Sequence, residues 1–259
     1  MRYSKKKPTV TIAITFKAKG INAINSYIVY GFPSPITFWG FAHTIAYRLN
    51  AKLHNESVLP ITHYFRNRIT KEAFHQQKSA ERDGGAKGQT IVDLPRADIE
   101  TTMVFKLEYT QNQEITQETI KNIMKNMRFA GGVILQNTIK ISINIDEKEV
   151  YGKIRKKGFI YKKMDIQLSK NNELDDFIKY LTIKKGEKNG WKIATLLGYS
   201  PIEKPQIREN TRFGHKHQFA EPLIGIAKFS KFNKFETTLA KDGWVLETSE
   251  KLIKIYNKG

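Results

Sequence analysis

The chain has 259 residues, of which 40% are apolar and 11% aromatic, and this composition excludes wholesale disorder. Its 44 lysines and arginines outnumber 25 acidic residues, for a formal charge of +19. This imbalance favours a polyanionic partner over a lysine-rich surface that serves only solubility, and nucleic acid is a better candidate than an anionic membrane surface. The lack of cysteine excludes disulfides, thiolate catalysis and Cys-ligated metal centres, and it suits a cytoplasmic protein.

The first predicted strand and helix enclose a polar, asparagine-rich loop. β-branched residues alternate with smaller ones over Thr9–Phe16 and predict a strand, which the loop Lys17–Gly31 follows. A helix is predicted over Ser34–Leu53, because Ser34 can cap it, Pro35 suits its first turn, and apolar residues recur at helical spacing. A polar loop fixed on so apolar a helix is a common way of holding a binding surface still.

The apolar stretch Tyr27–Leu49 is long enough to resemble a membrane span. Its two prolines, together with His43 and Arg48, argue against insertion into a bilayer. We therefore expect no membrane contact.

Four further elements complete the first half of the chain. A strand at Val58–Arg66 contains Pro60, which favours a position at a sheet edge. The long polar connection Asn67–Asp98 is of a kind that is usually functional or mobile. The patterns beyond it predict a strand, a helix and a strand: Ile99–Tyr109, Thr116–Met127 and Val133–Ile145.

The resulting order is strand, helix, strand, strand, helix, strand. This order is typical of the ferredoxin-like or RRM-like pattern, in which two helices pack on one face of an antiparallel sheet. The other face would be free to bind. We therefore predict an α+β fold with an RRM-like core over residues 1–148.

Beyond residue 148 the pattern is less regular. A hairpin is predicted at Tyr151–Leu168, turning near Gly158, and a helix at Asn172–Ile183. A short helix, a basic loop, a strand and a hairpin around Asp242–Gly243 are predicted next, at Trp191–Leu197, Pro201–His217, Pro222–Phe229 and Phe235–Tyr256. We expect residues 149–218 to form an irregular insertion and residues 219–259 to supply strands that pack back on the core.

The segment Lys153–Lys163 combines cations with aromatic residues, as RNA-binding surfaces do. Its candidate phosphate contacts are Lys153, Arg155 and Lys157, and its candidate stacking residues are Phe159 and Tyr161. A hairpin with one solvated basic face and one packed aromatic face explains the same pattern equally well.

The glycine-rich segment Gly84–Gln89 resembles a phosphate-cradling loop only superficially, because the Gly-Lys-Ser/Thr ending is missing. We favour an ordinary loop over a nucleotide site and keep Lys87 as a candidate contact to an RNA backbone.

Histidines offer a catalytic alternative. His43, on the first predicted helix, could act as the general base of a metal-independent ribonuclease, although most such histidines are structural. His215 and His217 lie in a loop whose sequence offers no carboxylate cluster, so neither a metal site nor a cofactor is predicted.

Several blocks of the sequence resemble one protein family. These blocks are Ile21–Ser26, Tyr30–His43, Lys87–Asp93, Arg128–Ile134 and, more faintly, Phe219–Leu223. In this order they resemble the second Csy subunit of type I-F CRISPR surveillance complexes. That subunit belongs to the RAMP superfamily, which is built on RRM-like folds.

The resemblance implies a non-catalytic subunit that grips the 5′ handle of the CRISPR RNA (crRNA). Its implied partners are a large subunit that reads the motif flanking the DNA target and the first copy of the backbone subunit. Target DNA is a further candidate partner, and no homo-oligomer is expected. A RAMP endoribonuclease that processes precursor crRNA through a histidine such as His43 is the alternative.

Carried onto this chain, the resemblance implies two groups of handle-binding residues. Asn22, Asn25 and Ser26 form the first group, in the loop, and Arg128, Gly131 and Gly132 form the second, after the second helix. Arginine and backbone N–H groups suit phosphates, while asparagine amides can read base edges. The hook or thumb region of the family corresponds to Tyr151–His217.

Overall fold

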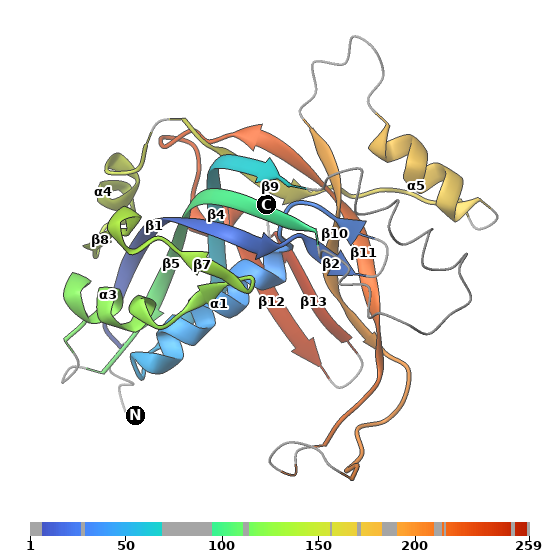
Figure 1. Ribbon diagram of the computed structural model, residues 1–259, viewed down its shortest axis with the longest axis horizontal. Helices are drawn as coiled ribbons and strands as arrows, with labels where there is room; N and C mark the ends of the chain where they lie inside the picture. The colour runs from blue at the N-terminus through green and yellow to red at the C-terminus, as the bar shows by residue number, and fades with distance from the viewer. Residues whose placement is uncertain are drawn as a thin grey trace, which may run out of the picture.

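The computed structural model describes residues 7–26, 29–68, 95–110, 114–155, 157–169, 172–182, 191–209, 214, 216–249 and 252–257. Within them the chain forms a large antiparallel sheet with a few helices, which agrees with the predicted α+β class (Figure 1). The strand order is β12-β13-β10-β11-β9-β4-β5-β1-β7-β6, and β8 also pairs with β1.

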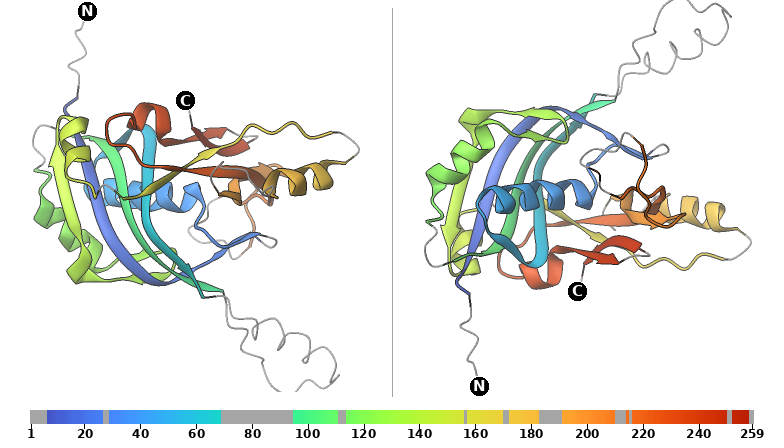
Figure 2. Two further views of the ribbon diagram at one scale, coloured as in Figure 1. Left: turned by 90° about the horizontal axis from the view of Figure 1, so that it is seen from above. Right: turned by 90° about the horizontal axis from the view of Figure 1, so that it is seen from below.

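Four strands build the centre of the first half. They are β1 (Thr9–Asn22), β4 (Lys52–Asn67), β5 (Arg96–Glu108) and β8 (Lys140–Asn144). Their spatial order is β4-β5-β1-β8, and each neighbouring pair is antiparallel. The β1, β4 and β5 strands curve around helix α1 (Pro35–Arg48) (Figure 2).

The prediction that Lys17–Gly31 forms a loop is wrong. Residues Lys17–Asn22 continue β1 and pair with β5 and β7, and the remainder forms a small hairpin of β2 (Ile24–Ser26) and β3 (Val29–Tyr30). Backbone groups this close to a sheet are paired more readily by strands than by a loop.

Helix α1 begins as predicted but ends earlier. Pro35 occupies its first turn, and Phe38, Phe41 and Ile45 face the core. The helix stops at Arg48 because Asn50, with a φ of 51°, turns the chain into β4; the predicted end at Leu53 is therefore wrong.

Pro60 does not mark a sheet edge. β4 pairs with β5 on one side, while the other side pairs with β12 at Ser57–Val58 and with β9 at Thr62. Pro60 lies between these two short pairings, so its missing N–H interrupts neither of them.

Helix α3 (Gln117–Lys125) confirms the second predicted helix, with Thr116 capping it through the N–H of Thr119 at 3.1 Å. The single strand predicted at Val133–Ile145 is wrong. It is divided into β7 (Gly132–Ile134), the 3-10 helix η1 (Gln136–Thr138) and β8. β7 and β8 pair with different parts of β1, so the chain has to step between them.

The face of the sheet opposite α1, which we call the second face, is not wholly free. Helix α4 (Glu147–Gly152) covers part of it, where Val150 and Tyr151 pack on Ala13, Leu59 and Val104. The hairpin predicted at Tyr151–Leu168 is wrong for the same reason. Its first part belongs to α4, and β9 (Phe159–Lys163) is the strand that remains.

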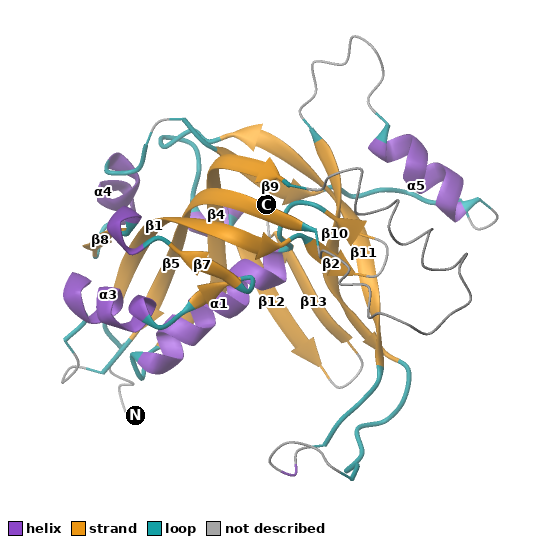
Figure 3. Cartoon of the chain, in the orientation of Figure 1, coloured by secondary structure: helices purple, strands orange, loops and turns teal. Residues whose placement is uncertain are grey.

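The C-terminal half extends the sheet through β10 (Lys192–Pro201), β11 (Ala220–Lys231), β12 (Trp244–Ser249) and β13 (Leu252–Asn257). The helix predicted at Trp191–Leu197 is wrong, because these residues pair with β11. Helix α5 (Glu173–Leu181) confirms another prediction and lies at the margin of the sheet (Figure 3).

The turn signal Asp242–Gly243 does not join two strands. Short helix α6 (Leu239–Asp242) ends there and leads into β12, which pairs with both β13 and β4. Trp244 is buried beneath this junction and donates from Nε1 to the Tyr161 carbonyl at 3.0 Å. Among the helices that the structure describes, none is long and apolar enough to cross a membrane.

Candidate nucleic-acid interface

A bulge at Gly20 fixes the end of β1. The register with β5 shifts between Ala18 and Ile21, and Gly20 has a φ of 63°, which favours glycine. Its N–H donates to Asp98 Oδ1 at 3.1 Å, and its carbonyl accepts from Arg96 at 3.0 Å. The bulge is therefore held from both sides, and Asn22 follows it at a defined position.

Asp98 is the anchor of this arrangement. Burial acts to raise the pKa of its carboxyl, but hydrogen bonds from Arg68 and from the Gly20 N–H outweigh burial and hold the pKa below its ordinary value. Asp98 thus remains ionised at neutral pH and keeps Arg68 beside the end of β1.

The end of β1 meets the turn after α3. The Asn22 N–H donates to the Ala130 carbonyl at 2.8 Å, in the turn that joins β6 (Arg128–Phe129) to β7. Ala130 and Gly131 both have positive φ, and a Cβ on Gly132 would lie 2.7 Å from the Ile21 nitrogen. Glycine at position 132 is what permits this close approach.

The structure thus brings together the two predicted handle-binding groups. Asn22 lies beside the turn that carries Arg128, Gly131 and Gly132, and the exposed Arg128 donates to the Gly131 carbonyl at 3.3 Å.

The other members of the first group lie in the adjoining hairpin. Asn25 and Ser26 belong to β2, and the backbone places them next to β3. The Asn22 side chain shapes the entry to this hairpin by accepting from the Ile24 N–H at 2.9 Å. Lys87 lies outside the described residues.

Cations gather on the part of the second face that α4 leaves open. We call this part the basic face and define it as Lys17, Lys19, Arg66, Arg128 and Arg155. Lys17 and Lys19 are two residues apart on β1 and so share a face. Lys19 is paired with Val133, which in turn is paired with Arg128, so these three side chains also lie on one face. Lys17 is paired with Glu100 on β5, and Asp98, two residues away on that strand, lies on the same face. Arg66 is paired with Asp98 and therefore joins this face.

The first part of the predicted segment Lys153–Lys163 reaches the same face. Arg155 lies 3.6 Å from Glu100, whose carboxylate also contacts Lys17 at 3.4 Å. Lys157 is exposed, and its carbonyl accepts a hydrogen bond from His63. Lys153 caps the end of α4 and is exposed.

His63 ties this segment to the sheet. Its Nδ1 donates to the Lys157 carbonyl at 2.7 Å, because a carbonyl can only accept, and its Nε2 accepts from Thr102 at 2.7 Å. Burial lowers the pKa of His63, and the charge on Arg155 acts in the same direction, against the Lys157 carbonyl and Glu100. The imidazole is therefore neutral at pH 7.

An aromatic cavity of about 1120 Å³ lies beside the end of β4 and the β2–β3 hairpin. Tyr64, Phe159 and Trp191 line it and are 49%, 49% and 76% exposed, respectively. Lys228 and Lys231 line it as well. Tyr64 is paired with Glu100 and so lies on the side of the sheet that carries the basic face, whereas Phe32 and Phe65, which also line the cavity, belong to the core on the side of α1.

The sequence had pointed to only part of this surface. Phe159 was predicted to stack, and it is exposed in the cavity, whereas Tyr161 is fully buried and cannot reach a ligand. Tyr64 and Trp191 were missed. The β-branched residues Ile193 and Thr195 within a short apolar run were the available signal for a strand beginning beside Trp191.

His43 belongs neither to the basic face nor to the lining of the aromatic cavity. It is exposed on α1 and stacks on Trp39, with ring centroids 4.8 Å apart. Trp39 is in turn held by a hydrogen bond of 2.9 Å to the Glu56 carbonyl.

The comparison with protein families assigns the chain. The model of the CRISPR-associated protein family Cas_Csy2 matches residues 12–159, more than half of the chain. The chain belongs to the Csy2 family. The predicted resemblance to the second Csy subunit of type I-F CRISPR complexes is thereby confirmed.

A curated relative agrees with this family assignment. The CRISPR-associated protein Csy2 of Pseudomonas aeruginosa (strain UCBPP-PA14) is 32% identical over 128 residues. The matched region covers 44% of this chain and 38% of the relative, so the chain matches well under half of that protein's length. A crystal structure of a CRISPR protein from Archaeoglobus fulgidus covers 96% of this chain and 100% of its own at 7% identity, but its TM-score of 0.30 supports no statement about this fold.

The family match divides the candidate interface. The meeting point of Asn22 with the Arg128–Gly132 turn lies within residues 12–159, as do Tyr64 and Arg155. Trp191 and the lysines on β11 lie beyond it. The cavity is therefore built partly from the family-matched region and partly from the C-terminal half.

Proposed function

We propose that this Csy2 family member is a non-catalytic, crRNA-binding subunit of a type I-F Csy complex and that it grips the 5′ handle of the crRNA. One observation carries the proposal. Residues Asn22 and Arg128 are 106 positions apart in the sequence. Asn22 nevertheless meets the Arg128–Gly132 turn through a hydrogen bond of 2.8 Å at the edge of the basic face. Both segments lie within the region that the family model matches.

The fold supports an RRM-like core. The order β4-β5-β1-β8, with antiparallel neighbours and the helices α1 and α3 between the strands in sequence, is the order that such a unit requires. We propose residues 1–148 as this core, residues 149–218 as a hook or thumb insertion, and residues 219–259 as strands that complete the sheet.

The path of the RNA follows from the chemistry of the surface. Lys17, Lys19 and Arg128 offer cations for phosphates, and the backbone N–H groups of the glycine turn offer further donors. Bases that pass the β2–β3 hairpin would then reach the aromatic cavity, where exposed aromatic rings can stack on them without requiring one sequence. Asn25 and Ser26 on the hairpin are proposed to contact the handle between these two regions.

Other subunits are proposed to dock on the C-terminal half. Helix α5 buries none of its residues and exposes Leu174 and Ile178, two apolar side chains at helical spacing. A large subunit or the first backbone subunit would cover such a surface, and target DNA is a further partner that the charge allows. The complex would act in antiviral defence in the cytoplasm.

Crosslinking of the assembled complex tests the proposal. The chain is co-expressed with a crRNA and the other Csy subunits, and the crRNA positions crosslinked to it are mapped. We expect crosslinks in the 5′ handle, which disappear when the handle is replaced by an unrelated sequence of equal length. Crosslinks confined to the 3′ hairpin would overturn the assignment. Cleavage of precursor crRNA by the purified protein, abolished by His43→Ala, would instead identify a RAMP endoribonuclease.

A further inference from the structure

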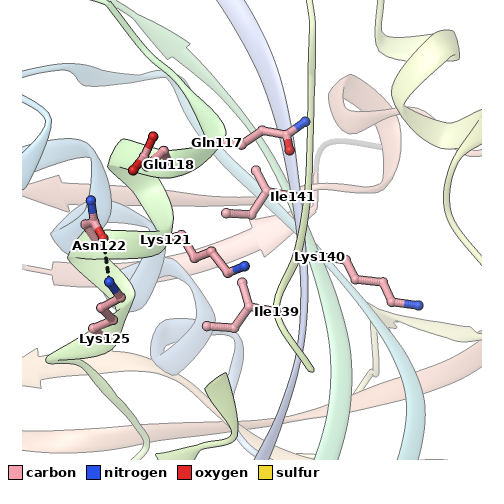
Figure 4. A pocket seen from close by; sticks show the side chains of 8 residues that line it. All are labelled: Gln117, Glu118, Lys121, Asn122, Lys125, Ile139, Lys140 and Ile141. Atoms are coloured by element: carbon pink, nitrogen blue, oxygen red, sulfur yellow. Dashed lines mark hydrogen bonds between the residues drawn. The ribbon is translucent and has the colours of Figure 1, made fainter. Parts of the chain in front are cut away.

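A second surface, away from the aromatic cavity, lies between helix α3 and strand β8. It forms a groove of about 650 Å³, lined on the helix by polar side chains and on the strand by Ile139, Lys140 and Ile141 (Figure 4). The helix contributes Gln117, Glu118, Lys121, Asn122 and Lys125.

The helix side of the groove is anchored in the core. On its inner side α3 buries Ile120 and Met124 completely, and Thr116 caps its first turn. The polar stripe of the helix is therefore fixed over the strand. Lys125 is further oriented by a hydrogen bond of 2.8 Å to Asn122, and Lys121 points into the space between helix and strand (Figure 4).

The strand side of the groove is an open sheet edge. Among the described residues β8 pairs with β1 alone, over Lys140–Asn144. Alternate backbone N–H and C=O groups of such an edge point away from the sheet and can pair with another strand. Ile145, which directly follows β8, is 76% exposed and extends the edge with an apolar side chain.

From these features we infer that the α3–β8 groove binds an extended, acidic segment of another polypeptide, which adds as a strand to the free edge of β8. The spacing fits such a ligand. Lys121 and Lys125 are four residues apart, about 6 Å along a helix. Side chains on one face of a strand repeat about every 6.8 Å. Glutamates at alternate positions would therefore face both lysines, with their methylenes on Ile139 and Ile141.

The lining disfavours the other occupants. Among the residues that line the groove there is no aromatic ring on which a base could stack, and Glu118 repels phosphates. The chain's own first six residues include Arg2, Lys5 and Lys6, so like charges oppose their binding beside Lys121 and Lys125. A bare lysine patch would serve either polymer, but a free strand edge is specific to a polypeptide.

A synthetic peptide tests the inference independently of RNA. The probe is a fluorescein-labelled octapeptide of alternating glutamate and threonine, and binding is followed by anisotropy with the full chain. We expect weak, saturable binding that Lys121→Glu and Lys125→Glu together reduce about tenfold or more, because like charges then oppose each other. Lys241→Glu, an equal charge change at an exposed residue of α6, is the control and should reduce binding far less.

Backbone methylation separates strand addition from simple charge attraction. Alternate N–H groups of a strand point to the same edge, so methylating the glutamate amides or the threonine amides blocks opposite edges. We expect one methylated peptide to lose binding and the other to keep it. Equal binding of both, or no effect of the lysine variants, would refute the groove as a strand-docking site. Displacement of the peptide by an oligouridylate that needs the same two lysines would make it a nucleic-acid site instead.

Both lysines are exposed, so the variants should unfold at the wild-type temperature, and Lys121→Gln gives a milder second variant.

Discussion

His63 links the sheet to the basic segment that follows α4. Thr15 and Thr102 lie 2.7 Å apart through their hydroxyls, Thr102 donates to His63, and His63 donates to the Lys157 carbonyl. This chain of hydrogen bonds requires a neutral imidazole, since a protonated ring could not accept at Nε2. The residue is structural, but it fixes Arg155 and Lys157 against the face that carries Lys17.

The lowered pKa of His63 predicts a pH dependence of stability. Because the folded-state pKa lies below the ordinary value of 6.5, the unfolded chain binds the proton more readily. The contribution to stability is therefore complete above pH 6.5 and is lost as the pH falls toward the folded-state pKa. We expect the melting temperature of the wild type to fall between pH 7.5 and pH 5.5 by a few degrees more than that of His63→Gln. Thermal unfolding at both pH values measures this, and equal falls in the two proteins would exclude the network as the cause.

The close approach of the β6–β7 turn to β1 leads to a prediction about stability and RNA binding. A methyl group at position 132 would meet the Ile21 nitrogen and the Lys19 carbonyl, both at 2.7 Å, and neither is a flexible side-chain end. Gly132→Ala should therefore push the turn away from β1, cost about 1–3 kcal/mol of unfolding free energy and weaken handle binding. Chemical denaturation and RNA titration measure the two effects.

Gly152→Ala is the matched control for this substitution. Gly152 lies at the end of α4, and a Cβ at this position would have no other atom within 4 Å. An added methyl group should therefore leave stability unchanged or raise it by about 0.5–1 kcal/mol. If Gly132→Ala is as stable as this control and binds the handle normally, the close approach to β1 has no role in the site.

The elements also explain which parts of the fold could be predicted. The strand from Thr9, the helix from Pro35 and the helices α3 and α5 carry their own signals, namely alternation, capping and helical spacing. The signal of β10 was ambiguous, because a short apolar run is compatible with a helix or a strand until its pairing partner is known. Its partner, β11, comes from a later part of the sequence. α4 was hidden for the same reason: its burial depends on Ala13, Leu59 and Val104.

The candidate site could be predicted only through its motifs. Asn22 and Arg128 were named because their sequence blocks resemble a family, yet nothing local indicates that Asn22 contacts the turn that follows Arg128. Their contact depends on the bulge at Gly20 and on the path of β7 beside β1. Tyr64 and Trp191 carry no motif at all, and they become candidates only when β4 and β10 bring them to one cavity.

Across the whole molecule, charge and aromatic surface should make separable contributions to RNA binding. With a net charge of +19, general attraction of RNA is expected from the entire chain, and it weakens with salt because counterions are released from the phosphates. A residue that holds one phosphate contributes to the salt dependence, whereas a ring that stacks on a base contributes to affinity without it. Arg128 on the basic face and Trp191 in the cavity represent these two cases.

Salt titration of handle binding distinguishes them. Arg128→Ala should lower the affinity and reduce the slope of log K against log salt by about 0.7, the value for one phosphate of a single strand. Trp191→Ala should cost about 1–3 kcal/mol, roughly 5- to 150-fold, and leave the slope unchanged. Lys241→Ala and Tyr47→Ala, an exposed cation and an exposed ring on other elements, are the controls. An unchanged slope for Arg128→Ala would rule it out as a phosphate ligand, and a reduced slope for Trp191→Ala would mean that the cavity binds backbone instead of bases.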